Sequence, residues 1–237
     1  MHVIADLEKR FEEVWAGDTE FIPELGGRPD MLCYCATELR TGQSIRLWED
    51  RLGDRPHRFD DGAAFICFTA MAECGCFLSR GWPLPKNVID LSPMFRCYIN
   101  GREPPAAGKG LIGALNHFGF DTVGEKYKDD MRKRILEGRP FSQEERAKIL
   151  DYCFSDVIQL GSLLEKLLAH VDLDRGLHWG EFAAVSAVME HNGVPLNLDV
   201  IRDLQDKHAW AFIRDALVPK INEQYGPRQN RRVALER

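Results

Sequence analysis

The chain has 237 residues, of which 44% are hydrophobic and 29% are charged. These proportions exclude a disordered or collagen-like polypeptide and predict a globular protein with one large domain, or a medium domain with an appendage. The formal net charge of −6 argues against broad electrostatic attraction to nucleic acid, although not against an enzyme whose acidic residues hold metal ions.

The N-terminal segment 1–14 is rich in charged residues and resembles an amphipathic helix rather than a secretory signal. No run of about eighteen apolar residues occurs, so no membrane span is expected. The seven cysteines lack C-x-x-C spacing, which disfavours a zinc or redox motif. We therefore expect free, mostly buried thiols in a reducing compartment, the cytoplasm.

The first half of the chain has the apolar runs and turn residues of a β-sheet. Strands are predicted at residues 14–22, 31–39, 44–49, 63–70 and 88–91. The first three suggest an antiparallel meander. The run 63–70 is continuously apolar, which is typical of a strand buried on both faces.

The second half has helical periodicity. Helices are predicted at residues 73–81, 111–118, 126–137, 142–171, 181–191 and 198–223. The fourth is expected to be one long amphipathic helix capped by Ser142. Segment 100–110 is rich in Gly and Pro, and its Gly108-Lys109-Gly110 lacks the spacing of a phosphate-binding loop, so a mobile loop is predicted. Strands followed by helices predict an α/β or α+β domain over residues 1–172 and a helical extension over 173–237.

Asp18 and Glu20 stand two residues apart in the first predicted strand. Residues i and i+2 of a strand share a face, so the two carboxylates would converge. The alternative is a pair of solvated charges on an edge strand. The second D-x-E copy, Asp6 and Glu8, lies on the predicted helix, where residues i and i+2 diverge.

Tyr152 and Asp156 are four residues apart on the long predicted helix, so they share one face. Both fall within or beside its apolar stripe, whereas Asp151 falls on the opposite side. A lone carboxylate on a core-facing stripe needs a compensating cation or hydrogen bonds. Asp156 is therefore a candidate metal ligand, and hydrogen bonding to nearby backbone amides is the alternative.

Glu73 follows the buried strand 63–70 by three residues. This position is at the end of a central strand, where open α/β sheets build their sites. A plain glutamate favoured by the helix dipole is the alternative, and it is the better explanation of Glu73 taken alone.

The order of these motifs resembles the DEDDy 3′–5′ exonucleases, the proofreading-domain superfamily with a ribonuclease-H-like fold. The resemblance covers residues 11–172 and implies a five-stranded mixed sheet, with three antiparallel strands and two more parallel to the first. It departs from the family pattern in two places, because Glu73 stands where aspartate is usual and Thr69 stands where asparagine is usual.

Segment 188–196, with its Asn192-Gly193-Val194, is similar to the segment that opens the thumb of family A DNA polymerases. The run 73–85 also resembles the phage-type and bacterial members of that group. Asn192-Gly193 alone would be an ordinary helix-capping turn. The resemblance implies a proofreading domain, although a polymerase palm and fingers are missing from the chain.

By resemblance, the site would hold two Mg²⁺ or Mn²⁺ ions. Asp18 would bridge both ions, Glu20 and Asp156 would complete the shell of the first, and Glu73 would hold the second through water. Tyr152 would orient the attacking water. Hard divalent cations suit such carboxylate ligands.

The implied partner is a single-stranded DNA 3′ end, with RNA possible, together with a palm and fingers if the chain is a fragment. A catalytically weak exonuclease fold that binds DNA or acts as a scaffold, and a stand-alone RNA-trimming DEDDy enzyme, are the alternatives. Seven basic residues could grip a strand, although a basic helix face is most often solvated: Arg96, Lys109, Lys126, Lys128, Arg132, Lys133 and Arg134. Tyr98, Phe118 and Tyr127 could stack on bases or pack in the core.

Overall fold

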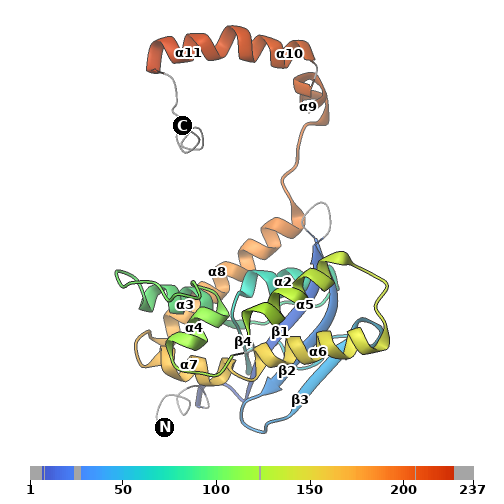
Figure 1. Cartoon of the computed structure of the whole chain (residues 1–237), viewed down its shortest axis with the longest axis vertical. Helices are drawn as coiled ribbons and strands as arrows, with labels where there is room; N and C mark the ends of the chain where they lie inside the picture. The colour runs from blue at the N-terminus through green and yellow to red at the C-terminus, as the bar shows by residue number, and fades with distance from the viewer. Residues whose placement is uncertain (1–6, 8, 24–27, 123, 206, 227–237) are drawn as a thin grey trace. The chain divides into compact units, whose positions relative to one another are not determined.

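A five-stranded mixed sheet, in the order β3-β2-β1-β4-β5, forms the centre of the first part of the chain (Figure 1). The computed structural model describes residues 7, 9–23, 28–122, 124–205 and 207–226. The strands are β1 (Glu13–Pro23), β2 (Pro29–Glu38), β3 (Ser44–Trp48), β4 (Ala63–Cys67) and β5 (Asn87–Asp90). β1, β2 and β3 are antiparallel neighbours, whereas β4 and β5 run parallel to β1. This topology confirms the predicted α/β, ribonuclease-H-like fold.

Helices connect and cover these strands. Up to residue 192 they are α2 (Ala70–Ser79), α3 (Leu91–Tyr98), α4 (Leu111–His117), α5 (Glu125–Glu137), α6 (Gln143–Val157), α7 (Leu160–Leu168) and α8 (Leu173–Asn192), with a short 3-10 turn at Glu49–Arg51. Segment 100–110 forms no helix or strand, as predicted. Ser142 caps α6 as expected, because its side chain accepts a hydrogen bond from Glu145 N while Glu145 bonds back to Ser142 N.

Three helix predictions are wrong in detail. The predicted helix 142–171 is two helices, interrupted at residues 158–159. Val157 and Leu160 on either side are both buried in one cluster, so the apolar periodicity continues across the break and hides it. Helix α3 went unpredicted, although the Asp90 side chain caps it by accepting from Ser92 N. The predicted N-terminal helix is helical at its described residues Leu7, Lys9 and Arg10, but it ends earlier than predicted, because β1 begins at Glu13. Asp6 and Glu8 lie outside the described residues.

The division of the chain also differs from the prediction at residue 172. One compact unit runs to Gly193 and a second begins at Val194. The boundary moves because α8 begins at Leu173, capped by Asp172, and packs against α2 and β5. The second unit contains α9 (Leu198–Gln205), α10 (Lys207–Phe212), a π-helical stretch Ile213–Leu217 and α11 (Val218–Tyr225). No helix of the described part is long and apolar enough to span a membrane.

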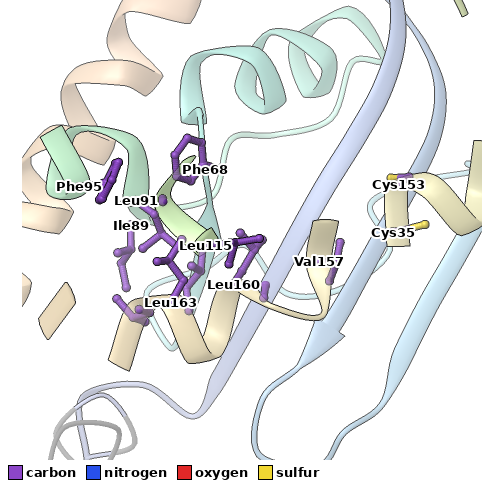
Figure 2. Packing of buried hydrophobic residues seen from close by; sticks show 14 of the residues in the cluster. Cys35, Phe68, Ile89, Leu91, Phe95, Leu115, Cys153, Val157, Leu160 and Leu163 are labelled. Atoms are coloured by element: carbon purple, nitrogen blue, oxygen red, sulfur yellow. The ribbon is translucent and has the colours of Figure 1, made fainter. Parts of the chain in front are cut away.

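Each face of the sheet packs against its own set of helices. Val14 and Ala16 of β1 pack with α6 and α7, whereas Trp15 between them packs with α2 and α8. Figure 2 shows the first cluster, where Leu160 and Leu163 of α7 approach Leu91 and Ile89. The alternation of strand side chains therefore decides which helices each residue of β1 meets.

The seven cysteines are all free, as predicted. Six are buried, and Cys97 is exposed. Cys35 and Cys153 lie in the apolar layer between β2 and α6 (Figure 2).

Helix α8 approaches β5 closely at Gly180. A Cβ atom there would lie 2.0 Å from the backbone oxygen of Val88, so any larger residue must push the helix from the sheet. We expect Gly180→Ala to lower the free energy of unfolding by about 1–3 kcal/mol, the usual cost of overpacking, as measured by urea denaturation.

Gly75→Ala is the matched control, because Gly75 is also inside a helix but its added Cβ would meet only Pro29 at 3.6 Å. This variant should be as stable as wild type or more stable, since alanine is the better helix former. Equal stability of the Gly180→Ala and wild-type proteins would show that α8 can shift without cost.

Candidate active site

β1 carries Asp18 and Glu20 on the face of the sheet that α6 covers. Both follow Val14 and Ala16 at intervals of two, and those residues are buried in the cluster of α6 and α7. Thr19 points to the other face, where its hydroxyl donates to Cys76 Sγ at 3.4 Å. The register of β1 against β2 shifts between Glu20 and Phe21, so the strand bends just after the acidic pair.

Tyr152 and Asp156 lie on the inner side of α6, as predicted. Tyr152 is buried, and the Asp156 side chain is 13% exposed. Asp151 lies on the outer side, 66% exposed, in an ion pair with Arg46. Among the described residues Asp156 is bonded by Lys128 rather than by backbone amides, which were the alternative.

Glu73 lies in the first turn of α2, after β4, and is buried with 4% of its surface exposed. Its Oε2 atom has no hydrogen-bond partner. Glu73 does stand in the first turn of α2, where the helix dipole favours an acid; its burial is the feature that this alternative leaves unexplained. Thr69, the N-cap residue of α2, makes no capping hydrogen bond through its side chain and lines the same cavity as Glu73.

One cavity of about 760 Å³ collects all five predicted site residues, Asp18, Glu20, Glu73, Tyr152 and Asp156. Four basic residues also line it: Arg96 of α3, Lys109 of the loop 100–110, and Lys128 and Arg132 of α5. The cavity therefore combines the four predicted carboxylates, and that of Asp129 of α5, with four basic side chains.

Burial and mutual repulsion favour the protonated forms of these acids. Burial, and then the charge of Asp156, raises the pKa of Asp18 to about 7. Burial, and then the charge of Asp18, raises the pKa of both Glu20 and Glu73 well above the usual value. Keeping all of these acids ionised therefore requires positive charge in the cavity.

Lys128 supplies one such charge. Its Nζ donates to both carboxylate oxygens of Asp156, at 2.6 and 2.8 Å. Burial raises the pKa of Asp156, and the charge of Lys128 opposes this effect. The same ammonium lies 5.7 Å from the ring centroid of Tyr152.

The donors of the cavity suit hard divalent cations. Five carboxylates line it, four of them the predicted ligands and the fifth Asp129, and among the described residues the buried Glu73 Oε2 has no hydrogen-bond partner. Carboxylate oxygens are the ligands that Mg²⁺ and Mn²⁺ prefer. Within the described part of the chain, however, no three Asp, Glu, His or Cys side chains are drawn together closely enough to hold a metal ion as they stand.

Sequence reasoning did not separate the cavity cations from the other basic residues. Lys126, Lys133 and Arg134 do not line the cavity, although they lie on the same helix as Lys128 and Arg132. The signal was available, because Lys128 and Arg132 are four residues apart and so share one face of α5. Arg134 instead bonds Glu145 and backbone carbonyls.

The three candidate stacking aromatics do not line the cavity. Tyr98 and Phe118 pack on each other, with ring centroids 5.2 Å apart, so core packing describes them. Tyr127 is 41% exposed and meets the Tyr152 ring edge-on at 6.3 Å. Tyr127 of α5 therefore packs against Tyr152 outside the cavity.

Known nucleases share this fold. RNase D from Escherichia coli, described as an exoribonuclease involved in structured RNA processing, aligns with a TM-score of 0.56 and 16% identity over 86% of this chain and 51% of its own. The catalytic core of RRP6 from Trypanosoma brucei aligns with a TM-score of 0.54 and 15% identity over 86% and 54% of the two chains. A nuclease solved in its apo form aligns with a TM-score of 0.54 and 15% identity over 86% of this chain and 92% of its own.

The chain thus spans about half the length of the first two proteins. No protein-family model and no curated protein matches its sequence. The structural likeness establishes the exonuclease fold. These neighbours are nucleases and not DNA polymerases, so they do not support the narrower family A assignment.

The segment that suggested a polymerase thumb has a local structural explanation. Gly193 is the C-cap of α8, with a φ of +69° and an N–H that reaches the carbonyls of Met189 and Glu190. A left-handed backbone at this position favours glycine. Asn192-Gly193 therefore behaves as the helix-capping turn that was its alternative interpretation.

The raised pKa of Asp18 makes stability depend on pH. A carboxyl whose pKa is about 7 when folded and 3.8 otherwise contributes stability that is complete below pH 4 and is lost as the pH rises to 7. Between those values, metal-free wild type should lose up to about 1.4 kcal/mol per pH unit relative to Asp18→Asn.

Urea denaturation of both proteins in EDTA from pH 4 to pH 8 measures this difference. Asp151→Asn, on the exposed side of α6, serves as the control and should follow the wild-type curve. A constant difference between wild type and Asp18→Asn across that range would show that Asp18 does not titrate in the folded protein.

Proposed function

We propose that this chain is a metal-dependent 3′–5′ exonuclease domain that removes nucleotides from the 3′ ends of RNA. The observation that carries the proposal is the single cavity in which Asp18, Glu20, Glu73, Tyr152 and Asp156 meet a basic wall. The RNA preference draws on RNase D, whose description names RNA. It corresponds to the stand-alone RNA-trimming enzyme among the hypotheses from sequence.

Asp18, Glu20 and Asp156 would hold one divalent cation, and Asp18 with Glu73 a second. When bound, such cations activate water and neutralise the charge that develops on the phosphate. Glu73 would act through water, and its extra methylene, compared with the usual aspartate, displaces the carboxylate and would weaken the hold on the second cation.

Tyr152 would position the attacking water. Burial, and then the charge of Glu20, raises its pKa above the usual value, so the hydroxyl keeps its proton at neutral pH. It can therefore orient water by hydrogen bonding but cannot act as a base. Lys128 of α5 is already close to its ring.

The basic wall would bind the backbone of the strand. Arg96, Lys109 and Arg132 come from three separate segments and line the same cavity as the acids of β1. Contacts to phosphate carry no sequence information. We therefore expect trimming with little sequence preference and with an affinity that falls as salt rises.

A proofreading domain of a DNA polymerase is the second candidate, because the order of the acidic motifs also resembles that of the DEDDy proofreading domains. Single strands of RNA and DNA with one sequence, labelled at the 5′ end and incubated with Mg²⁺ or Mn²⁺, separate the two proposals. We expect stepwise shortening of RNA from its 3′ end. Faster shortening of DNA would favour proofreading, and no shortening of either would contradict both.

The acids can be tested one by one in the same assay. Asp18→Ala and Asp156→Asn should lower the cleavage rate by orders of magnitude, since each removes a ligand that a cation requires. Asp151→Asn is the matched control on the outer side of α6 and should retain wild-type activity. An active Asp156→Asn protein would remove Asp156 from the site.

Tyr152→Phe should lower turnover while leaving Mn²⁺ affinity nearly unchanged, because it removes only the hydroxyl that positions water. Isothermal titration with Mn²⁺ and single-turnover cleavage measure the two quantities separately. A variant with unchanged turnover, or one whose Mn²⁺ binding is lost, would contradict this role.

A further inference from the structure

Lys128 is the most closely bound cation of the cavity. Both of its contacts to Asp156 are short, at 2.6 and 2.8 Å, and the two side chains are only 12% and 13% exposed. Both oxygens of the Asp156 carboxylate are thus engaged by one ammonium. Because little water screens the two charges, they attract each other much more strongly than the charges of a surface ion pair.

The charge of Lys128 also reaches the first motif. It lowers the pKa of Asp18 and of Glu20, opposing the effects of burial and of the neighbouring acids. Lys128 therefore acts on three of the four predicted ligands, and Arg132 of the same helix adds a smaller effect at Glu20 and Asp156. A protein cation stands in this structure where the proposed function requires a metal ion.

We propose that Lys128 is an internal counter-cation that a divalent metal ion must displace from Asp156, and that Lys128 therefore sets the metal concentration at which the site loads. The inference rests on the proposed function, since it concerns the same carboxylates. Its physical basis is direct competition. The Asp156 oxygens cannot bind the ammonium and a cation at full strength together, and the two positive charges repel each other.

The side chain suits a reversible contact. Lysine carries its charge on a flexible four-carbon stem, whereas the planar guanidinium of arginine would clamp a carboxylate with a rigid pair of hydrogen bonds. On release, Lys128 would still line the cavity beside Arg132, one turn along α5.

Isothermal titration with Mn²⁺ alone, without nucleic acid, tests the proposal. Lys128→Met should bind Mn²⁺ on the order of tenfold more tightly than wild type, because it removes a competing charge from the ligand shell. Lys133→Met is the matched control, since Lys133 is exposed on the same helix and does not line the cavity. It should bind Mn²⁺ as wild type does.

Removing Lys128 leaves Asp156 partly buried without its partner, so thermal melting should accompany the titration. Lys128→Gln is the second variant, because its amide can still donate a hydrogen bond to Asp156 but carries no charge. It should also bind Mn²⁺ more tightly than wild type. Mn²⁺ should raise the melting temperature of both uncharged variants by more than that of wild type.

The outcomes separate the inference from the proposed function. Equal Mn²⁺ affinity in wild type, Lys128→Met and Lys128→Gln, or weaker affinity in the two variants, would overturn the inference and leave the metal-dependent exonuclease standing. Absence of Mn²⁺ binding in every protein would overturn both. Tighter binding in the two variants that disappears when Asp156→Asn is added would support the displacement at Asp156.

Discussion

Negative charge gathered in one place is the constraint on which this structure depends. Asp18, Glu20, Glu73 and Asp156 line one cavity, and both burial and mutual repulsion oppose their ionisation. Such a cluster is stable only if some groups hold protons or if cations balance them. Lys128 supplies one charge from α5, and the nuclease chemistry that we propose would replace it with divalent ions.

The scaffold creates this cluster by bringing three distant segments to one edge of the sheet. β1 contributes two acids through its strict alternation, α2 contributes Glu73 directly after the parallel strand β4, and α6 contributes Tyr152 and Asp156 from its inner face. The surrounding layers are packed tightly enough to leave little freedom. At Gly17, the residue before Asp18, an added Cβ would lie 2.6 Å from the Phe65 ring, so this part of β1 accepts only glycine without rearrangement.

The same cavity has two chemically different walls. The acidic wall is suited to cations, and the basic wall formed by α3, α5 and loop 100–110 is suited to phosphate. The net charge of −6 conceals this arrangement, because the basic residues are local and the acids dominate the total. Overall charge is thus a poor guide to the partner of a protein whose binding surface is a small concave site.

The mixed arrangement of the strands was implied by the resemblance to the DEDDy exonucleases. The sequence by itself determined where the strands lie, the shared face of Asp18 and Glu20, and the inner position of Asp156. These features follow from local periodicities of two and 3.6 residues, which are written in consecutive residues. Only the tertiary structure decided that Lys128, rather than Lys126 or Lys133, meets Asp156, that α6 and α7 are separate helices, and that α8 belongs to the first unit. Each of these depends on contacts between segments far apart in the chain, and a one-dimensional pattern holds no information about which partner a side chain meets.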